Sequence, residues 1–236
     1  MHPLYSIWQR TLQTAGAQAN GDAVFNALIN RYSEPHRHYH TLEHLTECLD
    51  WWEKTAHLAQ HPAAVLLALW FHDAIYDVHR QDNEINSAIL ANTELEKLAI
   101  AEDTRKAVTR LILCTKHSEV PCTADEKLLV DIDLTILGAS SDRFTNYETQ
   151  IRAEYSHVPK WLFTIKRRAI LKKFLQRTSI YSTAYFAQQF ETRARTNLKS
   201  SLRIKTAWAG SIFQRLLGKN PIQAQIYARS TWNPSS

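Results

Sequence analysis

The sequence predicts an all-α protein, and three observations support this prediction. Residues that favour helices dominate the 236-residue chain, whereas glycine occurs only 5 times. The strict alternation expected of half-buried strands is hard to find. Neither an internal repeat nor a Pro/Ser-rich linker divides the chain. We therefore expect one helical bundle over residues 1–200 and a partly helical extension over residues 201–236 that ends in a frayed tail.

The predicted helices are separated by capping residues and helix breakers. Asp22, Thr41 and Asp82 are candidate N-caps, Pro62 suits a first helical turn, and Gly138 ends a helix. The helices are expected over Leu4–Ala19, Asp22–Tyr32, Thr41–Lys54, Ala64–Asp77, Asn83–Ala99, Asp103–His117, Ala124–Leu137, Ser140–His157, Trp161–Arg177 and Ser182–Leu198.

Composition and cysteine usage indicate a cytoplasmic protein. The hydrophobic fraction of 44% is ample for a core, and three scattered cysteines favour free thiols over a disulfide framework. The N-terminus lacks the apolar core of a signal peptide, and no stretch approaches the roughly 20 apolar residues of a membrane span. The net charge of +5 is compatible with an anionic ligand, with nucleic acid, or with no particular partner.

The helix Ala64–Asp77 carries ionisable residues into the interior. It is apolar from Ala64 through Phe71 and then presents His72 and Asp73 side by side. A helix that is hydrophobic all round is buried, and an unpaired buried charge is too costly to persist. The pair therefore needs hydrogen bonds, a salt bridge or a metal ion.

Two other segments supply further candidates. His40 and His44 stand one helical turn apart, so their side chains can converge, although a surface cluster is the alternative. Asp131 and Asp133 are about 200° apart around a helix, so both cannot face the same way. Asp133 falls within the apolar arc and is the expected inward carboxylate, whereas Asp131 is expected to be solvated.

The expected inward groups are two imidazoles and two carboxylates, from His44, His72, Asp73 and Asp133. This set suits a divalent ion such as Mn, Fe, Co, Ni, Zn or Mg. A cation between the two aspartates removes the cost of burying them. We predict one bound divalent metal and leave a second ion open, with His117 as its candidate ligand.

The order His … His-Asp … Asp resembles the HD-domain superfamily of metal-dependent phosphohydrolases. The stretches YHTLEH, WFHDAIYD, DNEINSA and DIDLTILG, followed by KRRAILKKFLQR and ARTNL, are similar to a bacterial branch of predicted HD phosphohydrolases and cover roughly Arg31–Leu198. The resemblance implies an HD-domain-like helical bundle. It also implies hydrolysis of a small phosphoester, with a nucleotide as one candidate, by metal-activated water.

A narrower resemblance suggests catalytic residues. The segment Tyr39–His44 is similar to the YHNxxH signature of cyclic-nucleotide phosphodiesterases, with Thr41 in place of Asn. Carried over, His40 is the general acid that protonates the leaving oxygen and His44 is a metal ligand. Asp77 is a candidate for orienting water or holding a second ion, and a helix cap is the alternative.

Basic side chains must offset the charge of a phosphorylated substrate. Arg37, Lys166, Arg167 and Arg168 are the candidates, and a solvated basic face is the alternative for each. Two other functional classes stay open. A metal-containing ligand-binding or regulatory HD protein with little turnover would keep the four ligands. A nucleic-acid-binding protein would use the basic helix, but no reading motif is recognisable, so it ranks last.

Overall fold

The computed structural model describes residues 2–117 and 120–217, with side chains through Arg203 in the last helix. Within these residues the chain is all-helical and has no strand, which confirms the predicted fold class. The helices are α1 (Tyr5–Ala15), α2 (Asp22–Tyr32), α3 (Leu42–Thr55), η1 (Ala56–Leu58), α4 (Pro62–Phe71), α5 (Asn83–Lys97), α6 (Glu102–Cys114), α7 (Ala124–Asp133), η2 (Leu134–Gly138), α8 (Ser141–Glu154), α9 (Lys160–Gln176) and α10 (Ala184–Leu217).

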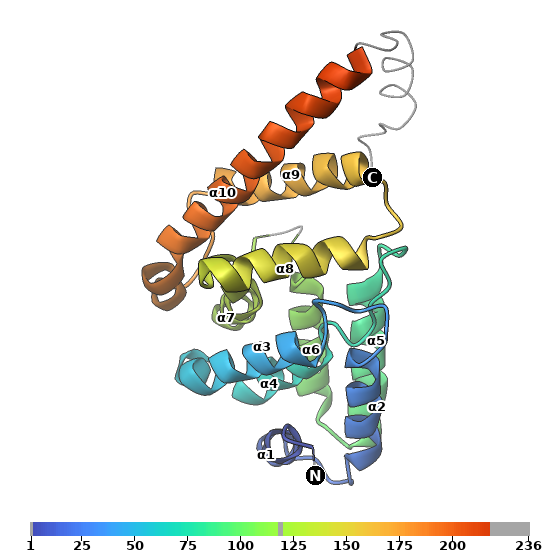
Figure 1. Ribbon diagram of the computed structural model, residues 1–236. Helices are drawn as coiled ribbons and strands as arrows, with labels where there is room; N and C mark the ends of the chain where they lie inside the picture. Colours follow the sequence, from blue (N-terminus) through green and yellow to red (C-terminus); the bar gives the residue numbers. More distant parts are fainter. Residues whose placement is uncertain (1, 118–119, 218–236) are drawn as a thin grey trace.

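The helix α4 lies at the centre of the fold. It contacts α1, α3, α5, α6 and α7, and Ala64–Phe71 are all buried, which confirms the predicted buried helix. Figure 1 shows α8, α9 and α10 stacked above this group, with α10 extending away from the rest. None of the helices in residues 2–117 and 120–217 combines the length and apolarity needed to cross a bilayer.

One wrong helix boundary matters for the site, and one predicted N-cap is also wrong. The helix α4 ends at Phe71, with His72 as its C-cap, so Asp77 lies in a loop and not one turn after Asp73. Asp22 is the first helical residue rather than the N-cap of α2. The prediction for Thr41 is confirmed, since its side chain accepts a hydrogen bond from the Glu43 amide at the start of α3.

Asp131 is fully buried, so the expectation that it is solvated is wrong. Its carboxylate accepts hydrogen bonds from the Ser182 amide and from both the amide and the hydroxyl of Thr183, just before α10. These donors belong to the unsatisfied start of a helix. The position of Asp131 on α7 points away from the metal candidates, as expected, but α10 covers that side.

The helix α10 runs without interruption through residue 201. The predicted division between residues 200 and 201 therefore falls inside a helix. The predicted frayed tail at residues 233–236 lies outside the described residues.

Candidate metal centre

The four predicted ligands come together at the junction of α3, α4 and α7. His44 lies in the first turn of α3, His72 caps the end of α4, Asp73 follows it, and Asp133 is the last residue of α7. His44 Nε2 lies 3.2 Å from His72 Nε2, 3.5 Å from Asp73 Oδ2 and 3.3 Å from Asp133 Oδ1. Residues from a segment of ninety positions thus bring their side-chain atoms close together.

The tautomer of His72 is set by the backbone. Its Nδ1 lies 2.9 Å from the carbonyl oxygen of Leu69, which can only accept a hydrogen bond. Nδ1 therefore carries a proton, and in the neutral ring Nε2 has a lone pair directed at His44. A carbonyl partner on the far nitrogen is the usual support for a histidine that binds a metal.

Burial differs across the cluster. The side chains of His44 and His72 are 2% and 1% exposed, whereas those of Asp73 and Asp133 are 19% and 16% exposed. The imidazoles thus form the floor of the site, and the carboxylates lie where solvent reaches it.

The charges of the cluster are strongly coupled. Burial alone raises the pKa of each aspartate, but hydrogen bonds and charge from the histidines hold the pKa of Asp133 and of Asp73 well below the usual range. Burial lowers the pKa of His44, and Cys48, Tyr39 and both aspartates outweigh it, so that its pKa lies well above the usual value. Buried carboxylates facing imidazoles need positive charge, which a proton or a divalent cation supplies.

Sequence reasoning missed Cys48, which also belongs to this cluster. Ligand atoms of His44, Cys48, His72 and Asp133 all lie within 4.8 Å of one another, so these four residues can hold a metal ion. The available signal was spacing, because Cys48 lies four residues after His44 on α3 and therefore on the same face.

His117, the candidate for a second ion, also lies beside the cluster. Its Nε2 is 3.1 Å from Asp133 Oδ2, the oxygen other than the one that faces His44. The backbone of His117 has a φ of 55°, in the left-handed region that non-glycine residues rarely adopt. Its Nδ1 is buried and has no hydrogen-bond partner among the described residues. Asp133 therefore links His117 to the two histidines of the cluster.

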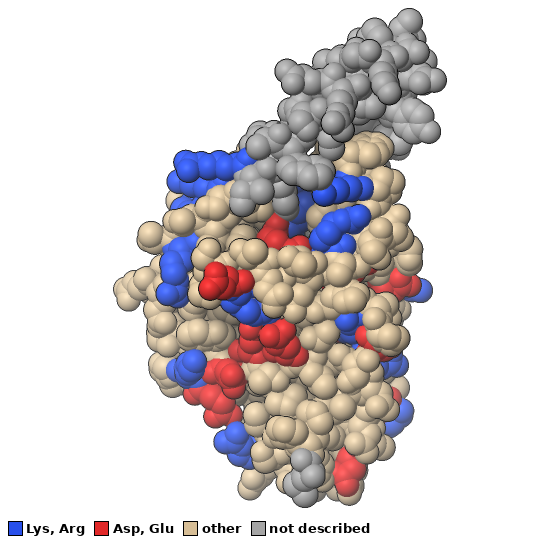
Figure 2. Space-filling view, in the orientation of Figure 1, with Lys and Arg blue, Asp and Glu red and all other residues tan. Residues whose placement is uncertain are grey.

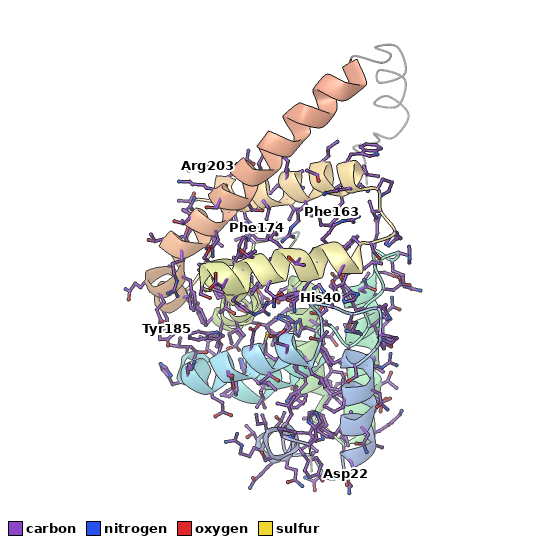
Figure 3. All side chains as sticks on the ribbon, in the orientation of Figure 1. Asp22, His40, Phe163, Phe174, Tyr185 and Arg203 are labelled. Carbon is purple, nitrogen blue, oxygen red and sulfur yellow. The ribbon has the colours of Figure 1, made fainter. Side chains whose placement is uncertain are left out.

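His40 is held by a carboxylate that the sequence did not point out. Its Nδ1 lies 2.9 Å from Glu154 Oε2, and its ring stacks on Tyr76 at 4.1 Å between centroids. The Tyr76 hydroxyl donates to the same oxygen at 2.7 Å. Figure 3 labels His40 beneath α8, the helix whose last residue is Glu154.

The other oxygen of Glu154 accepts the backbone amides of His38, Tyr39 and His40, at 2.8–3.0 Å. Burial raises the pKa of this carboxyl, but His40 and the surrounding donors outweigh burial and lower its pKa to about 2. Glu154 was invisible to sequence reasoning because it lies more than 110 positions from the loop that it holds.

Arg37 has a structural role, so its predicted contact with phosphate is wrong. Its side chain is inaccessible to solvent. The guanidinium donates to the carbonyl oxygens of His40, Asp73 and Ala74 and to the carboxylate of Glu34. Arg37 thereby joins the loop of His40 to the turn that carries Asp73. The chain after α4 needs these donors because its carbonyls have left the helical pattern.

Two of the three basic candidates on α9 are engaged in packing contacts. Arg167 is buried, donates to Glu148 at 2.7 Å and lies over the ring of Tyr147, and Arg168 donates to the carbonyl of Leu202. These contacts hold α9 against α8 and α10. Lys166 is exposed, as a solvated basic face predicts. Figure 2 shows Lys and Arg side chains over the upper part of the visible face, where α9 and α10 lie.

The loop residue Asp77 is partly buried and makes local contacts. Its Oδ1 accepts the amide of His79, and its own amide donates to Asn83 at the start of α5. Asp77 therefore caps neither neighbouring helix, because the C-cap of α4 is His72 and the N-cap of α5 is Asp82.

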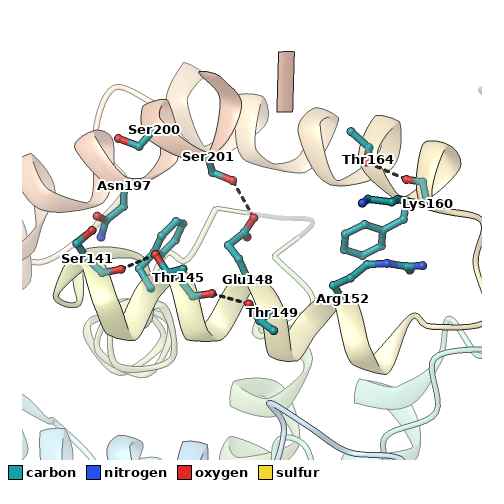
Figure 4. A pocket seen from close by; sticks show the side chains of 12 residues that line it. Ser141, Thr145, Glu148, Thr149, Arg152, Lys160, Thr164, Asn197, Ser200 and Ser201 are labelled. Carbon is teal, nitrogen blue, oxygen red and sulfur yellow. Dashed lines mark hydrogen bonds between the residues drawn. The ribbon is translucent and has the colours of Figure 1, made fainter. Parts of the chain in front are cut away.

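A cleft of about 500 Å³ lies between α8, α9 and α10, where Figure 4 shows Glu148 bonded to Ser201 and a row of threonine and serine hydroxyls. The residues that line it do not include the metal candidates or His40. The cleft is therefore separate from the predicted chemistry.

Comparison with known proteins gives no relative: no family model, no curated protein and no solved structure matches this chain.

Proposed function

We propose that this chain is a metal-dependent phosphohydrolase of the HD type, which hydrolyses a small phosphoester such as a nucleotide. The observation that supports this proposal most is the meeting of His44, His72, Asp73 and Asp133 in one buried cluster whose two carboxylates a divalent cation would balance. The resemblance of the sequence motifs to HD phosphohydrolases points the same way.

The candidate ligands suit the divalent metal ion that the proposal requires. Two neutral imidazole nitrogens and two carboxylates would hold a divalent ion, and Asp133 would bring His117 next to it. When bound, such an ion makes hydroxide available at neutral pH and polarises a phosphoryl oxygen.

His40 would supply the proton that the leaving oxygen needs. Glu154 faces Nδ1 of His40, which leaves Nε2 as the nitrogen that can donate to a substrate. Tyr76 stacks on the ring and fixes its plane. Glu154 and Tyr76 thus act as positioning residues, and His40 acts as the general acid.

A test of this role uses His40→Ala. The protein is purified with its metal, and hydrolysis is measured on a panel of phosphomonoesters and phosphodiesters that includes nucleotides. We expect the variant to keep its metal content while the maximal rate falls by roughly 10²–10⁴-fold, the usual contribution of a general acid. His38→Ala is the matched control, because His38 is exposed and two residues away. Loss of metal in His40→Ala would make His40 a ligand, and an unchanged rate would remove it from the mechanism.

A second function is supported by one observation. If Cys48, His44, His72 and Asp133 fill every position around the ion and leave none for water, the site is closed, as is typical of structural rather than catalytic metals. The chain would then be a metal-containing ligand-binding or regulatory protein with little turnover. Full metal content together with no hydrolysis across the whole panel would favour this function over the enzyme.

A further inference from the structure

Cys48 is the one member of the cluster whose chemistry distinguishes between metals. Its side chain is buried, and it extends from α3 on the same face as His44. A buried cysteine often acts only as a small apolar residue. The surroundings of this thiol are polar, however, and include both histidines and Asp133 of the cluster.

The position of the sulfur agrees with direct binding. Cys48 Sγ lies 3.8 Å from both ring nitrogens of His44, and of these Nε2 is the one that faces His72, Asp73 and Asp133. A sulfur at about 2.3 Å and a nitrogen at about 2.0–2.1 Å from one tetrahedral ion are separated by roughly 3.6 Å. The observed distance of 3.8 Å to Nε2 is close to this value.

We propose that Cys48 binds the metal directly through its sulfur and that the site consequently prefers zinc to magnesium or manganese. Thiolate is a soft ligand that favours zinc, whereas carboxylate and water suit magnesium and manganese. On binding, the thiol releases its proton to solvent as the bond between metal and sulfur forms. The inference rests on the metal-binding part of the proposed function, and it does not require turnover.

Cobalt substitution tests this assignment without an activity assay. The full-length protein is loaded with Co²⁺, and its absorption spectrum is recorded in the near ultraviolet, where a cobalt–thiolate bond gives an intense charge-transfer band. We expect this band in the wild type and expect it to vanish in Cys48→Ala and Cys48→Ser.

A variant that keeps Cys48 makes the test independent of how well Cys48→Ala and Cys48→Ser fold. The chain has 3 cysteines, so the double variant Cys114→Ser/Cys122→Ser leaves Cys48 as the sole source of thiolate. We expect the double variant to keep the band. In competition between Zn²⁺ and Mn²⁺, the preference for zinc should fall at least tenfold in Cys48→Ala, since even residues that only support ligands change affinity by about 10–100-fold.

The two proposals fail in different ways. Cobalt bound to the wild type without a charge-transfer band would overturn the role of Cys48 and leave a metal site of histidines and aspartates. Wild-type protein that binds neither cobalt nor zinc would overturn the metal site itself. A band that disappears in the double variant would assign the thiolate to Cys114 or Cys122 and so also overturn the inference.

Discussion

At the scale of single residues, Glu154 is the group whose role depends most on its protonation. One of its oxygens accepts three consecutive amides, and the other faces His40 and Tyr76. Each of these donors makes a stronger hydrogen bond to the charged carboxylate than to a protonated carboxyl group. The loop of His40 therefore relies on the charged form.

Stability should therefore depend on acid through Glu154. Its pKa is lowered to about 2 in the folded protein, so the unfolded chain binds this proton more tightly. The stabilisation is fully present above about pH 4.5 and is lost as the pH falls from there toward about 2. It amounts to roughly 3 kcal/mol.

We expect Glu154→Gln to be less stable at neutral pH and to lose less stability than the wild type on acidification. Urea unfolding between about pH 7 and about pH 3 measures both effects. Glu43→Gln is the control, because the side chain of Glu43 is half exposed. Parallel pH dependence in wild type and Glu154→Gln would show that this carboxyl does not govern acid stability.

At the scale of helices, periodicity and capping predicted most elements from the sequence. Thr41 caps α3 as expected, and the apolar run of Ala64–Phe71 is buried. The end of α4 was not predictable, because residues after Phe71 leave the helix to bond with Arg37, which lies 36 positions earlier. Likewise Asp131 is buried because the start of α10 covers it. A helical projection of α7 shows only the faces of that helix and cannot reveal this contact.

Contacts between helices also limit which residues can replace Gly138. This glycine ends η2 against α10, and a Cβ there would lie 2.7 Å from both Cβ and Cδ1 of Phe190 and 3.0 Å from its backbone oxygen. Because backbone and Cβ atoms cannot move aside cheaply, Gly138→Ala should lower the free energy of unfolding by about 1–3 kcal/mol.

Chemical denaturation of Gly138→Ala checks this expectation, with Gly16→Ala as the comparison. Gly16 has open space around it but a φ of 72°, so its cost comes from the backbone and not from crowding. Combining Gly138→Ala with Phe190→Gly, which removes both the Cβ and the Cδ1 atoms of residue 190, should recover part of the loss relative to Phe190→Gly alone if crowding is the cause. The same loss in both backgrounds would point to another origin.

At the scale of the whole molecule, the candidate centre joins three helices that are far apart in sequence. The candidate ligands His44, His72, Asp73 and Asp133 were predictable, because buried ionisable residues on apolar faces stand out. Cys48, Glu154 and the structural role of Arg37 were not, because each depends on which side chains meet in three dimensions.

A metal that binds only the folded chain should raise its melting temperature. At a free concentration of about 100 times Kd the gain is about 2.7 kcal/mol, and for a chain of this size each kcal/mol is worth roughly 2–4 °C. We expect a rise of about 5–10 °C on adding zinc or manganese to metal-free protein, measured by thermal denaturation.

Two aspartates two residues apart provide the matched pair for this measurement. Asp133→Ala should abolish the rise, because it removes a ligand. Asp131→Ala should start from a lower melting temperature, because the amides before α10 lose their acceptor, yet show the full rise. Equal responses in the two variants would place the metal elsewhere.

The link between Glu154 and the loop of His40 also bears on the order of folding. The hydrogen bonds of this carboxylate span 114–116 positions, whereas α5 and α6 are neighbours along the chain and pack together. Contacts between distant segments require closure of a long loop and form more slowly than local ones. During synthesis the N-terminal helices emerge well before residue 154. The segment that carries His40 thus reaches its final conformation only after α8 has been made and has docked.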